Sequence, residues 1–137
     1  MPRAVLDPNV LVSALISPKG ASARLLLELR AGAFELVVSP HVLAEFDEVL
    51  HREKFRRYAN ENEVDAYIDV LRRESILVDD PEPAPAPLAD DPDDEYLIAL
   101  ARAARVDALV SGDPHLTRLR ERIPVLGPRE FLKTLER

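Results

Sequence analysis

Residues 4–11 read AVLDPNVL, which is a short apolar run, an acid, a proline and then apolar residues at helical spacing. An apolar run bounded by a breaker is typical of a buried strand. Pro8 disfavours a helical conformation at Asp7 and suits the first turn of a following helix. We therefore expect Asp7 at the carboxyl end of a buried first strand, where ligands bind in open α/β sheets.

The composition is that of a globular protein of ordinary domain size. The chain has 137 residues, 47% hydrophobic and 31% charged, and we expect a single domain over residues 1–137. The absence of cysteine excludes disulfides, thiolate zinc sites and cysteine nucleophiles. We find no apolar run of the roughly 20 residues that a membrane span needs, and no signal-peptide pattern. These features favour a cytoplasmic protein with no membrane partner.

The negative charge is concentrated in one segment. The formal net charge is −7, which by itself disfavours a nucleic-acid partner. Residues 79–95 contain eight of the 25 acidic residues and no basic residue. The other 120 residues therefore carry 17 acidic and 18 basic side chains. Because the excess negative charge is local, a bound cation can offset part of it. The net charge therefore does not exclude a nucleic-acid partner.

Predicted strands and helices alternate along the chain. We predict strands over residues 4–6, 34–38, 76–78, 108–110 and 124–126. Ser22 is a candidate cap for a helix over 23–31 that stops at Gly32, and Ser39-Pro40 opens another helix. Asp91 or Asp93 starts a helix that runs to Arg105, after an extended proline-rich loop over residues 81–87. This alternation predicts an α/β fold of three layers around a parallel sheet of four to five strands.

Four acids fall at the carboxyl edge of the predicted sheet. Asp7 ends the first strand, Asp113 follows the fourth, Asp94 opens the helix before the fourth, and Glu45 lies in the helix after the second. An acid at this buried edge is costly to desolvate unless a cation meets it. Converging carboxylates with no lysine or arginine in the local motifs indicate a hard-cation site with oxygen ligands, such as Mg²⁺ or Mn²⁺. Such an ion would suit hydrolysis of a phosphodiester.

Each acid also has a purely structural interpretation. Asp7 can serve as a helix cap, Asp94 can interact with a helix dipole, and Asp113 can be an ordinary turn residue. Glu45 can occupy an exposed helix face. The four acids taken together favour the metal site, because carboxylates repel one another unless a cation neutralises them.

Four motifs in order resemble the PIN domain family, and more narrowly the VapC-like ribonucleases that are toxins of toxin–antitoxin pairs. They are DPNVLVSAL (7–15), SPHVLAEFDEVL (39–50), DPDDEYLIALA (91–101) and LVSGDPHL (109–116). The resemblance runs from about residue 3 to GPREFLKTL (127–135). It implies a compact α/β fold, RNA as substrate, Mg²⁺ or Mn²⁺ as cofactor, a possible cognate antitoxin and a homodimer.

The resemblance also implies roles for particular residues. The metal-binding and catalytic acids of the family match Asp7, Glu45, Asp94 and Asp113. Asp93 is a candidate substitute for Asp94. Asn9 matches an asparagine that supports the site by hydrogen bonds, and Ser111 occupies the hydroxyl position near the last acid.

One departure from the family leaves a second hypothesis open. Pro8 stands where the family usually has threonine or serine, so a hydroxyl and an amide are lost. The alternative to a ribonuclease is therefore a PIN-like binding or assembly module without catalysis. An aspartyl phosphatase is disfavoured because Asn9 stands at the second acid of its Asp-x-Asp-x-Thr motif. A dinucleotide-binding domain is disfavoured because no Gly-rich loop follows the first predicted strand.

Other residues give weaker signals. Three histidines share no ligand spacing, and surface or core positions account for them best: His41, His51 and His115. The basic runs at 52–57 and 118–122 can contact RNA phosphates, although a solvated helix face explains each equally well. Tyr58, beside the first run, is a candidate for stacking on a base.

Overall fold

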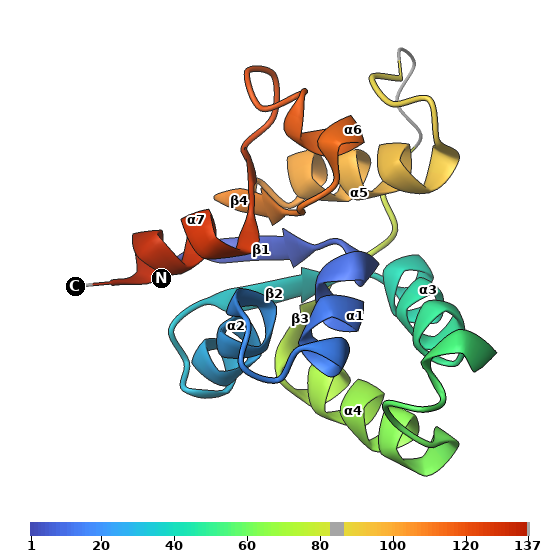
Figure 1. Cartoon of the computed structure of the whole chain (residues 1–137). Helices are drawn as coiled ribbons and strands as arrows, with labels where there is room; N and C mark the ends of the chain where they lie inside the picture. The colour runs from blue at the N-terminus through green and yellow to red at the C-terminus, as the bar shows by residue number, and fades with distance from the viewer. Residues whose placement is uncertain (83–86, 137) are drawn as a thin grey trace.

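The computed structural model describes residues 1–82 and 87–136 and shows a sheet covered by helices (Figure 1). The strands are β1 (Arg3–Leu6), β2 (Glu35–Val38), β3 (Ser75–Leu77), β4 (Ala108–Val110) and β5 (Val125–Leu126). The helices are α1 (Pro8–Ile16), α2 (Ala21–Arg30), α3 (Pro40–Leu50), α4 (Glu61–Arg73), α5 (Pro92–Ala103), α6 (Pro114–Thr117) and α7 (Pro128–Leu135), with a 3₁₀ turn at Glu53–Phe55.

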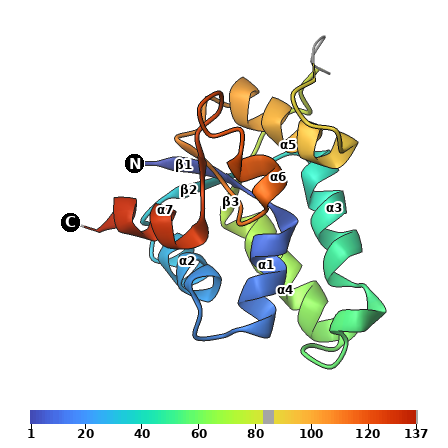
Figure 2. The same ribbon diagram turned by 45° about the horizontal axis from the view of Figure 1, so that its top comes forward.

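The five strands form one parallel sheet in the order β3-β2-β1-β4-β5, which confirms the predicted fold class. α1, α2 and α4 lie on one side of this sheet and α5 lies on the other, as the two views agree (Figures 1 and 2). The chain moves outward from β1 to β3 and then returns to place β4 on the other side of β1. The strand order therefore reverses between β1 and β4, and such a reversal opens a crevice at the carboxyl ends of these two strands.

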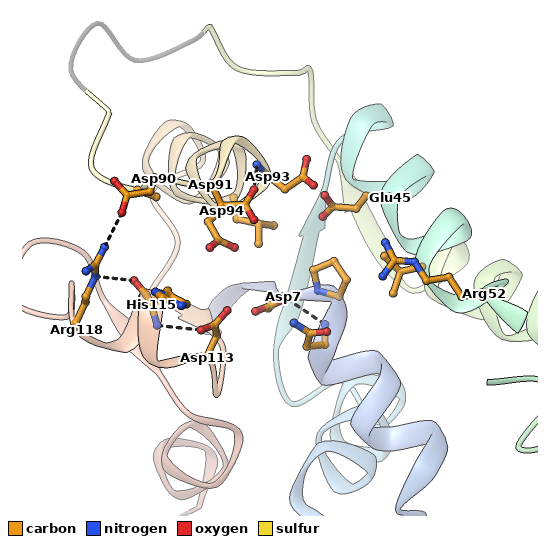
Figure 3. A pocket seen from close by; sticks show the side chains of 15 residues that line it. Asp7, Glu45, Arg52, Asp90, Asp91, Asp93, Asp94, Asp113, His115 and Arg118 are labelled. Carbon is orange, nitrogen blue, oxygen red and sulfur yellow. Dashed lines mark hydrogen bonds and ion pairs between the residues drawn. The ribbon is translucent and has the colours of Figure 1, made fainter. Parts of the chain in front are cut away.

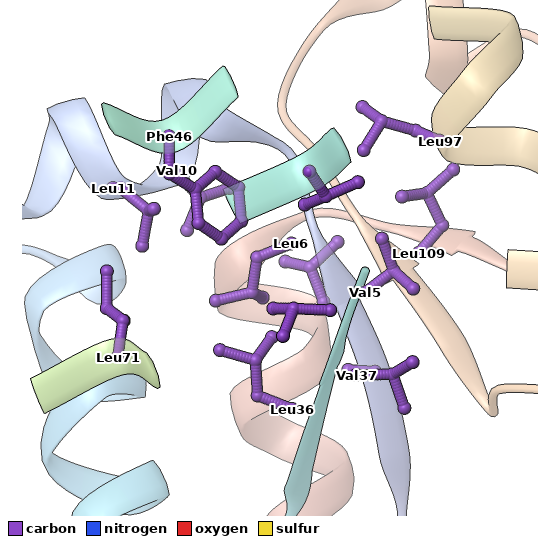
Figure 4. Packing of buried hydrophobic residues seen from close by; sticks show 14 of the residues in the cluster. Val5, Leu6, Val10, Leu11, Leu36, Val37, Phe46, Leu71, Leu97 and Leu109 are labelled. Carbon is purple, nitrogen blue, oxygen red and sulfur yellow. The ribbon is translucent and has the colours of Figure 1, made fainter. Parts of the chain in front are cut away.

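β1 is the centre of the hydrophobic core, because it pairs on both sides and its last three residues are fully buried. Figure 4 shows Val5 and Leu6 of β1 among side chains of the neighbouring strands, with Phe46 of α3 close by. Burying one side chain of this size contributes about 1.5–3 kcal/mol. No single helix in the described part of the chain is long and apolar enough to span a membrane, although α1 and α2, bent by 105°, pass by length and composition as a pair.

Local signals fix the ends of several helices, and those at Ser39 and Gly32 were predicted. Ser39 caps α3, because its hydroxyl accepts the Val42 N–H at 3.3 Å. Asn60 and Glu63 form a reciprocal capping box at the start of α4. Gly32 follows α2 with a φ of +82°, a left-handed conformation that costs a residue with a Cβ more than glycine.

Several boundaries differ from the predictions by one or two residues, and three of them illustrate the causes. Ser22 is not a cap: α2 begins at Ala21 after Gly20, and Ser22 is buried inside the helix. The third strand begins one residue earlier than expected, since Ser75 pairs with Leu36. The fifth helix ends at Ala103, because Arg105 adopts a left-handed φ of +52°. Residues 83–86 of the predicted proline-rich loop lie outside the described residues.

Candidate metal centre

A pocket of about 350 Å³ lies where the strand order reverses, beyond the carboxyl ends of β1 and β4. Acidic side chains from four segments of the chain surround it (Figure 3): Asp7, Glu45, the acids of residues 90–94, and Asp113. Of the seven predicted site residues, Ser111 is buried and does not line the pocket. The other six line it: Asp7, Asn9, Glu45, Asp93, Asp94 and Asp113. The pocket is therefore an acidic site built from distant segments.

Asp7 is the most buried of these acids, with 3% of its surface exposed. Its extended backbone, fixed before Pro8, caps α1, and its Oδ1 accepts the Asn9 N–H at 3.0 Å. The Ser111 hydroxyl donates to its Oδ2 at 2.7 Å. Burial raises the pKa of Asp7, while these two hydrogen bonds oppose the rise and the charge of Asp113 adds to it. The protein thus holds this carboxylate rigidly at an energetic cost.

Ser111 connects Asp7 to Asp113. Its hydroxyl oxygen accepts the Asp113 N–H at 3.0 Å while its proton is donated to Asp7. Asp113 in turn caps α6 through the His115 N–H at 2.9 Å. Asn9 contributes its backbone N–H to Asp7, and no side-chain hydrogen bond of Asn9 is found among the described residues. The serine therefore has the supporting position predicted for it, whereas Asn9 acts through its backbone.

Asp94 and Glu45 approach the same pocket from α5 and α3. Asp94 is the third residue of α5, whose first turn is capped by Asp91. Burial raises the pKa of Asp94 to about 6, with further repulsion from Asp91, Asp7 and Asp113. The charge of His115 opposes this rise. Asp94 thus experiences the charges of acids on β1 and β4, which are remote from it in sequence.

Glu45 shows the largest effect of this crowding. Burial raises its pKa to about 7, and repulsion from Asp93, Asp7 and Asp94 contributes to the shift. One oxygen of Glu45, one of Asp93 and a ring nitrogen of His41 lie within 4.8 Å of one another. Asp7, Asp94 and Asp113 do not form such a tight triple in the part of the chain that the structure describes. Their side chains would have to draw together around an ion.

The residues present fit a hard divalent cation. Within residues 1–82 and 87–136, no ion pair joins Asp7, Glu45, Asp94 or Asp113 to an arginine, a lysine or a histidine. Their oxygens are the ligands that Mg²⁺ and Mn²⁺ take. Burial is the main reason that the pKa values of Asp7, Glu45 and Asp94 are raised, and repulsion between neighbouring carboxylates adds to the rise. The site therefore has both the ligand chemistry and the unbalanced charge of a cation site.

The sequence analysis named the basic runs that contain Arg52 and Arg118 as candidate RNA contacts, but it did not place these residues beside the acids. Arg52 and Arg118 line the pocket, although the local acidic motifs contain no cation. Arg52 pairs with Glu48 at 3.0 Å, and Arg118 pairs with Asp90 at 3.7 Å. His115 also lines the pocket. It lies two residues after Asp113, and this nearness in sequence was the one signal that could have indicated its position. The arginines come from other segments, so their arrival depends on the tertiary fold.

An α/β domain with acids gathered at the switch point of its parallel sheet is the class that the fold and the site define. The model of the PIN domain family matches residues 3–115, and the chain belongs to this family. A chain of the crystal structure of VapBC2 from Rickettsia felis, bound to a DNA fragment from their promoter, has a similar fold. Its TM-score is 0.61 at 18% identity, over 91% of this chain and 98% of that one. Comparison with curated proteins gives no match.

Proposed function

We propose that this protein is a divalent-metal-dependent endoribonuclease and the toxin of a toxin–antitoxin pair. The observation that carries the proposal is the pocket in which Asp7, Glu45, Asp94 and Asp113 meet without a basic partner. Membership of the PIN domain family supports a nuclease. RNA is the proposed substrate and Mg²⁺ or Mn²⁺ the proposed cofactor.

Asp7, Asp94 and Asp113 would hold the cation. When bound, the ion supplies a Lewis acid that stabilises negative charge on a phosphoryl oxygen. Ser111 fixes the orientation of Asp7 through a 2.7 Å hydrogen bond, and its second contact fixes the backbone of Asp113. Supporting groups of this kind commonly change metal affinity about 10- to 100-fold when they are removed.

Glu45 is the proposed base. Its pKa of about 7 lies near the pH at which such an enzyme works, which is the favourable range for accepting a proton from a water molecule. Asp93, beside Glu45, contributes to this value by repulsion. Glu45 can also serve as a further ligand, because its carboxylate lines the same pocket.

Two arginines supply the positive charge that RNA phosphates need. Arg52 and Arg118 lie on different sides of the acids in Figure 3, and each comes from one of the two basic runs in the sequence. Both side chains are about half exposed, so they can exchange their carboxylate partners for phosphate oxygens. We propose that they contact the backbone on the two sides of the cleaved bond.

The proposed partner is a cognate antitoxin protein. The support comes from the VapBC2 complex, which has a similar fold. We further propose a homodimer acting in the cytoplasm, as the family resemblance implies. Mixing the protein with the product of a small neighbouring reading frame, followed by size-exclusion chromatography, tests both the partner and the dimer.

The ribonuclease proposal is tested by cleavage of a single-stranded RNA with Mn²⁺. We expect the wild-type protein to cleave within the strand, and Asp94→Asn to cleave at least about 100-fold more slowly. Asp69→Asn is the matched control, because Asp69 pairs with Arg72 on the exposed face of α4, away from the pocket. Equal cleavage by the wild type and Asp94→Asn would contradict the assignment.

A binding module without catalysis is the second candidate, and Pro8 favours it. Pro8 is buried at the first position of α1, lines the pocket and supplies neither a hydroxyl nor an N–H. Calorimetry with Mn²⁺ separates the two functions. The nuclease requires binding below millimolar concentration, whereas the absence of heat at millimolar Mn²⁺ would favour the module.

A further inference from the structure

Two aromatic rings stack beside the acidic pocket, although they come from different helices. His41 is the second residue of α3, and Tyr96 is the fifth residue of α5. Their ring centroids are 3.9 Å apart and their planes differ by 30°. Neither ring has a part in the mechanism proposed above.

Hydrogen bonds with Asp80 and Ser39 support the stacked pair of His41 and Tyr96. Asp80 accepts a hydrogen bond from the Tyr96 hydroxyl and another from the His41 backbone N–H, the latter at 3.1 Å. The Ser39 hydroxyl, which caps α3, also lies 3.3 Å from the Tyr96 hydroxyl. Asp80 and Ser39 thus fix the Tyr96 ring, and Asp80 also fixes the His41 backbone, while the imidazole stacks on Tyr96. Part of the conformational freedom is therefore already lost before a ligand binds.

The imidazole of His41 is the accessible member of the pair. His41 is exposed, whereas Tyr96 is half-buried behind it. A ring nitrogen of His41 lies within 4.8 Å of carboxylate oxygens of both Glu45 and Asp93, which line the pocket. A planar group stacked on His41 would therefore lie beside the acids of the pocket.

We propose that His41, supported by Tyr96, is a stacking platform for one base of a single-stranded RNA beside the cleaved bond. The inference rests on the proposed function and adds a subsite to it. Every base has a planar face, so stacking requires no particular sequence. A base in a duplex is already stacked on its neighbours, so the platform selects unpaired RNA.

The test compares two substitutions of His41 that distinguish stacking by its ring from metal binding by its nitrogen atoms. His41→Ala removes the stacking surface, whereas His41→Phe keeps an aromatic ring without a metal-binding nitrogen. The probe is a short single-stranded RNA with 2-aminopurine at successive positions, whose fluorescence reports stacking, in a Ca²⁺ buffer. Leu27→Ala is a control, because Leu27 is an exposed apolar residue of α2 outside the pocket lining.

We expect the wild type to change the fluorescence at one position of the RNA. His41→Ala should weaken binding and raise KM about 5- to 150-fold, which corresponds to 1–3 kcal/mol for one stacked base, with kcat little changed. His41→Phe and Leu27→Ala should bind RNA as the wild type does. Mn²⁺ affinity should be the same in all four proteins.

Three results would overturn the platform. They are wild-type RNA affinity in His41→Ala, no fluorescence change at any position, or a loss of Mn²⁺ binding in both His41 variants, which would make the imidazole a ligand. Failure of the ribonuclease proposal looks different. A wild type that stacks the probe but does not cleave RNA with Mn²⁺ refutes the enzyme and keeps the platform.

Discussion

The Asp7 carboxyl group lies in a place where its ionised form is costly. It is 3% exposed, its two oxygens accept hydrogen bonds from Asn9 and Ser111, and no basic side chain pairs with it among the described ion pairs. A buried carboxylate without a counter-charge lowers stability unless a ligand uses it. We therefore propose that Asp7, at a cost in stability, serves to bind a cation.

Asp7→Asn should therefore separate activity from stability. The amide keeps the shape and can still accept the Asn9 N–H, so the metal-free variant should have a melting temperature equal to or above that of the wild type. RNA cleavage with Mn²⁺ should fall at least about 100-fold. Differential scanning fluorimetry in EDTA and a cleavage assay measure the two effects. Wild-type cleavage by Asp7→Asn would mean that Asp7 serves only as the cap of α1.

At the scale of one element, the end of α2 depends on Gly32. Its φ of +82° lets the N–H of Ala33 reach the carbonyl of Glu28 at 2.9 Å and its own N–H reach that of Leu29 at 3.1 Å. These two bonds terminate the helix and direct the chain into β2.

Gly32→Ala should lower the free energy of unfolding by about 1–2 kcal/mol, because a Cβ is disfavoured in the left-handed conformation. A Cβ at Gly32 meets no atom within 4 Å, so the cost is conformational and not steric. Gly112→Ala is the matched control: it has equal space and no positive φ. Urea denaturation of both variants measures the difference, and equal stabilities would contradict the explanation.

Elements with strong local signals were predictable from sequence, and the differences have local physical causes. β1 and β4 are short apolar runs followed by Asp7 and Ser111, so their ends were clear. Ser22 has the chemistry of a cap, yet it is buried within α2, and the turn before that helix uses Gly20. Arg105 ends the fifth helix region in a left-handed conformation that sequence patterns assign to glycine or asparagine.

At the scale of the whole molecule, the acidic cluster makes stability depend on pH. The folded-state pKa values of Glu45 and Asp94, about 7 and about 6, lie above their ordinary values of 4.5 and 3.8. The folded protein therefore binds protons more tightly than the unfolded chain in this range. The free energy of unfolding therefore rises as the pH falls through the folded-state pKa values, and the increase is complete near the unfolded-state pKa values.

We expect the metal-free protein to melt at a higher temperature at about pH 5.5 than at about pH 8, with the cluster as the main cause. The double variant Glu45→Gln, Asp94→Asn should show a much flatter dependence. Mn²⁺ should raise the melting temperature of the wild type most at the higher pH, because protons compete with the metal. Thermal melts in EDTA and in Mn²⁺ test this, and identical pH profiles for wild type and double variant would refute it.

The site was predictable to the extent that topology fixes it. Acids that follow parallel strands must meet at one edge, so the sequence brought Asp7, Asp94 and Asp113 to a common place, and the pocket contains them. Their roles as ligands stay a prediction. The positions of Arg52 and His41 beside the acids could not be predicted, since they depend on how α3 packs against its neighbours. A surface arginine and an exposed histidine carry no local sign of that packing.

The central claim, that remote carboxylates share one cation, is tested most directly by titrating the metal-free protein with Mn²⁺ in a calorimeter. The account predicts saturable binding by the wild type, the same binding by Asp69→Asn, and an affinity lower by about 10- to 100-fold in both Asp7→Asn and Asp94→Asn. No saturable binding by the wild type, or unchanged binding in the Asp7→Asn, Asp94→Asn double variant, would contradict it.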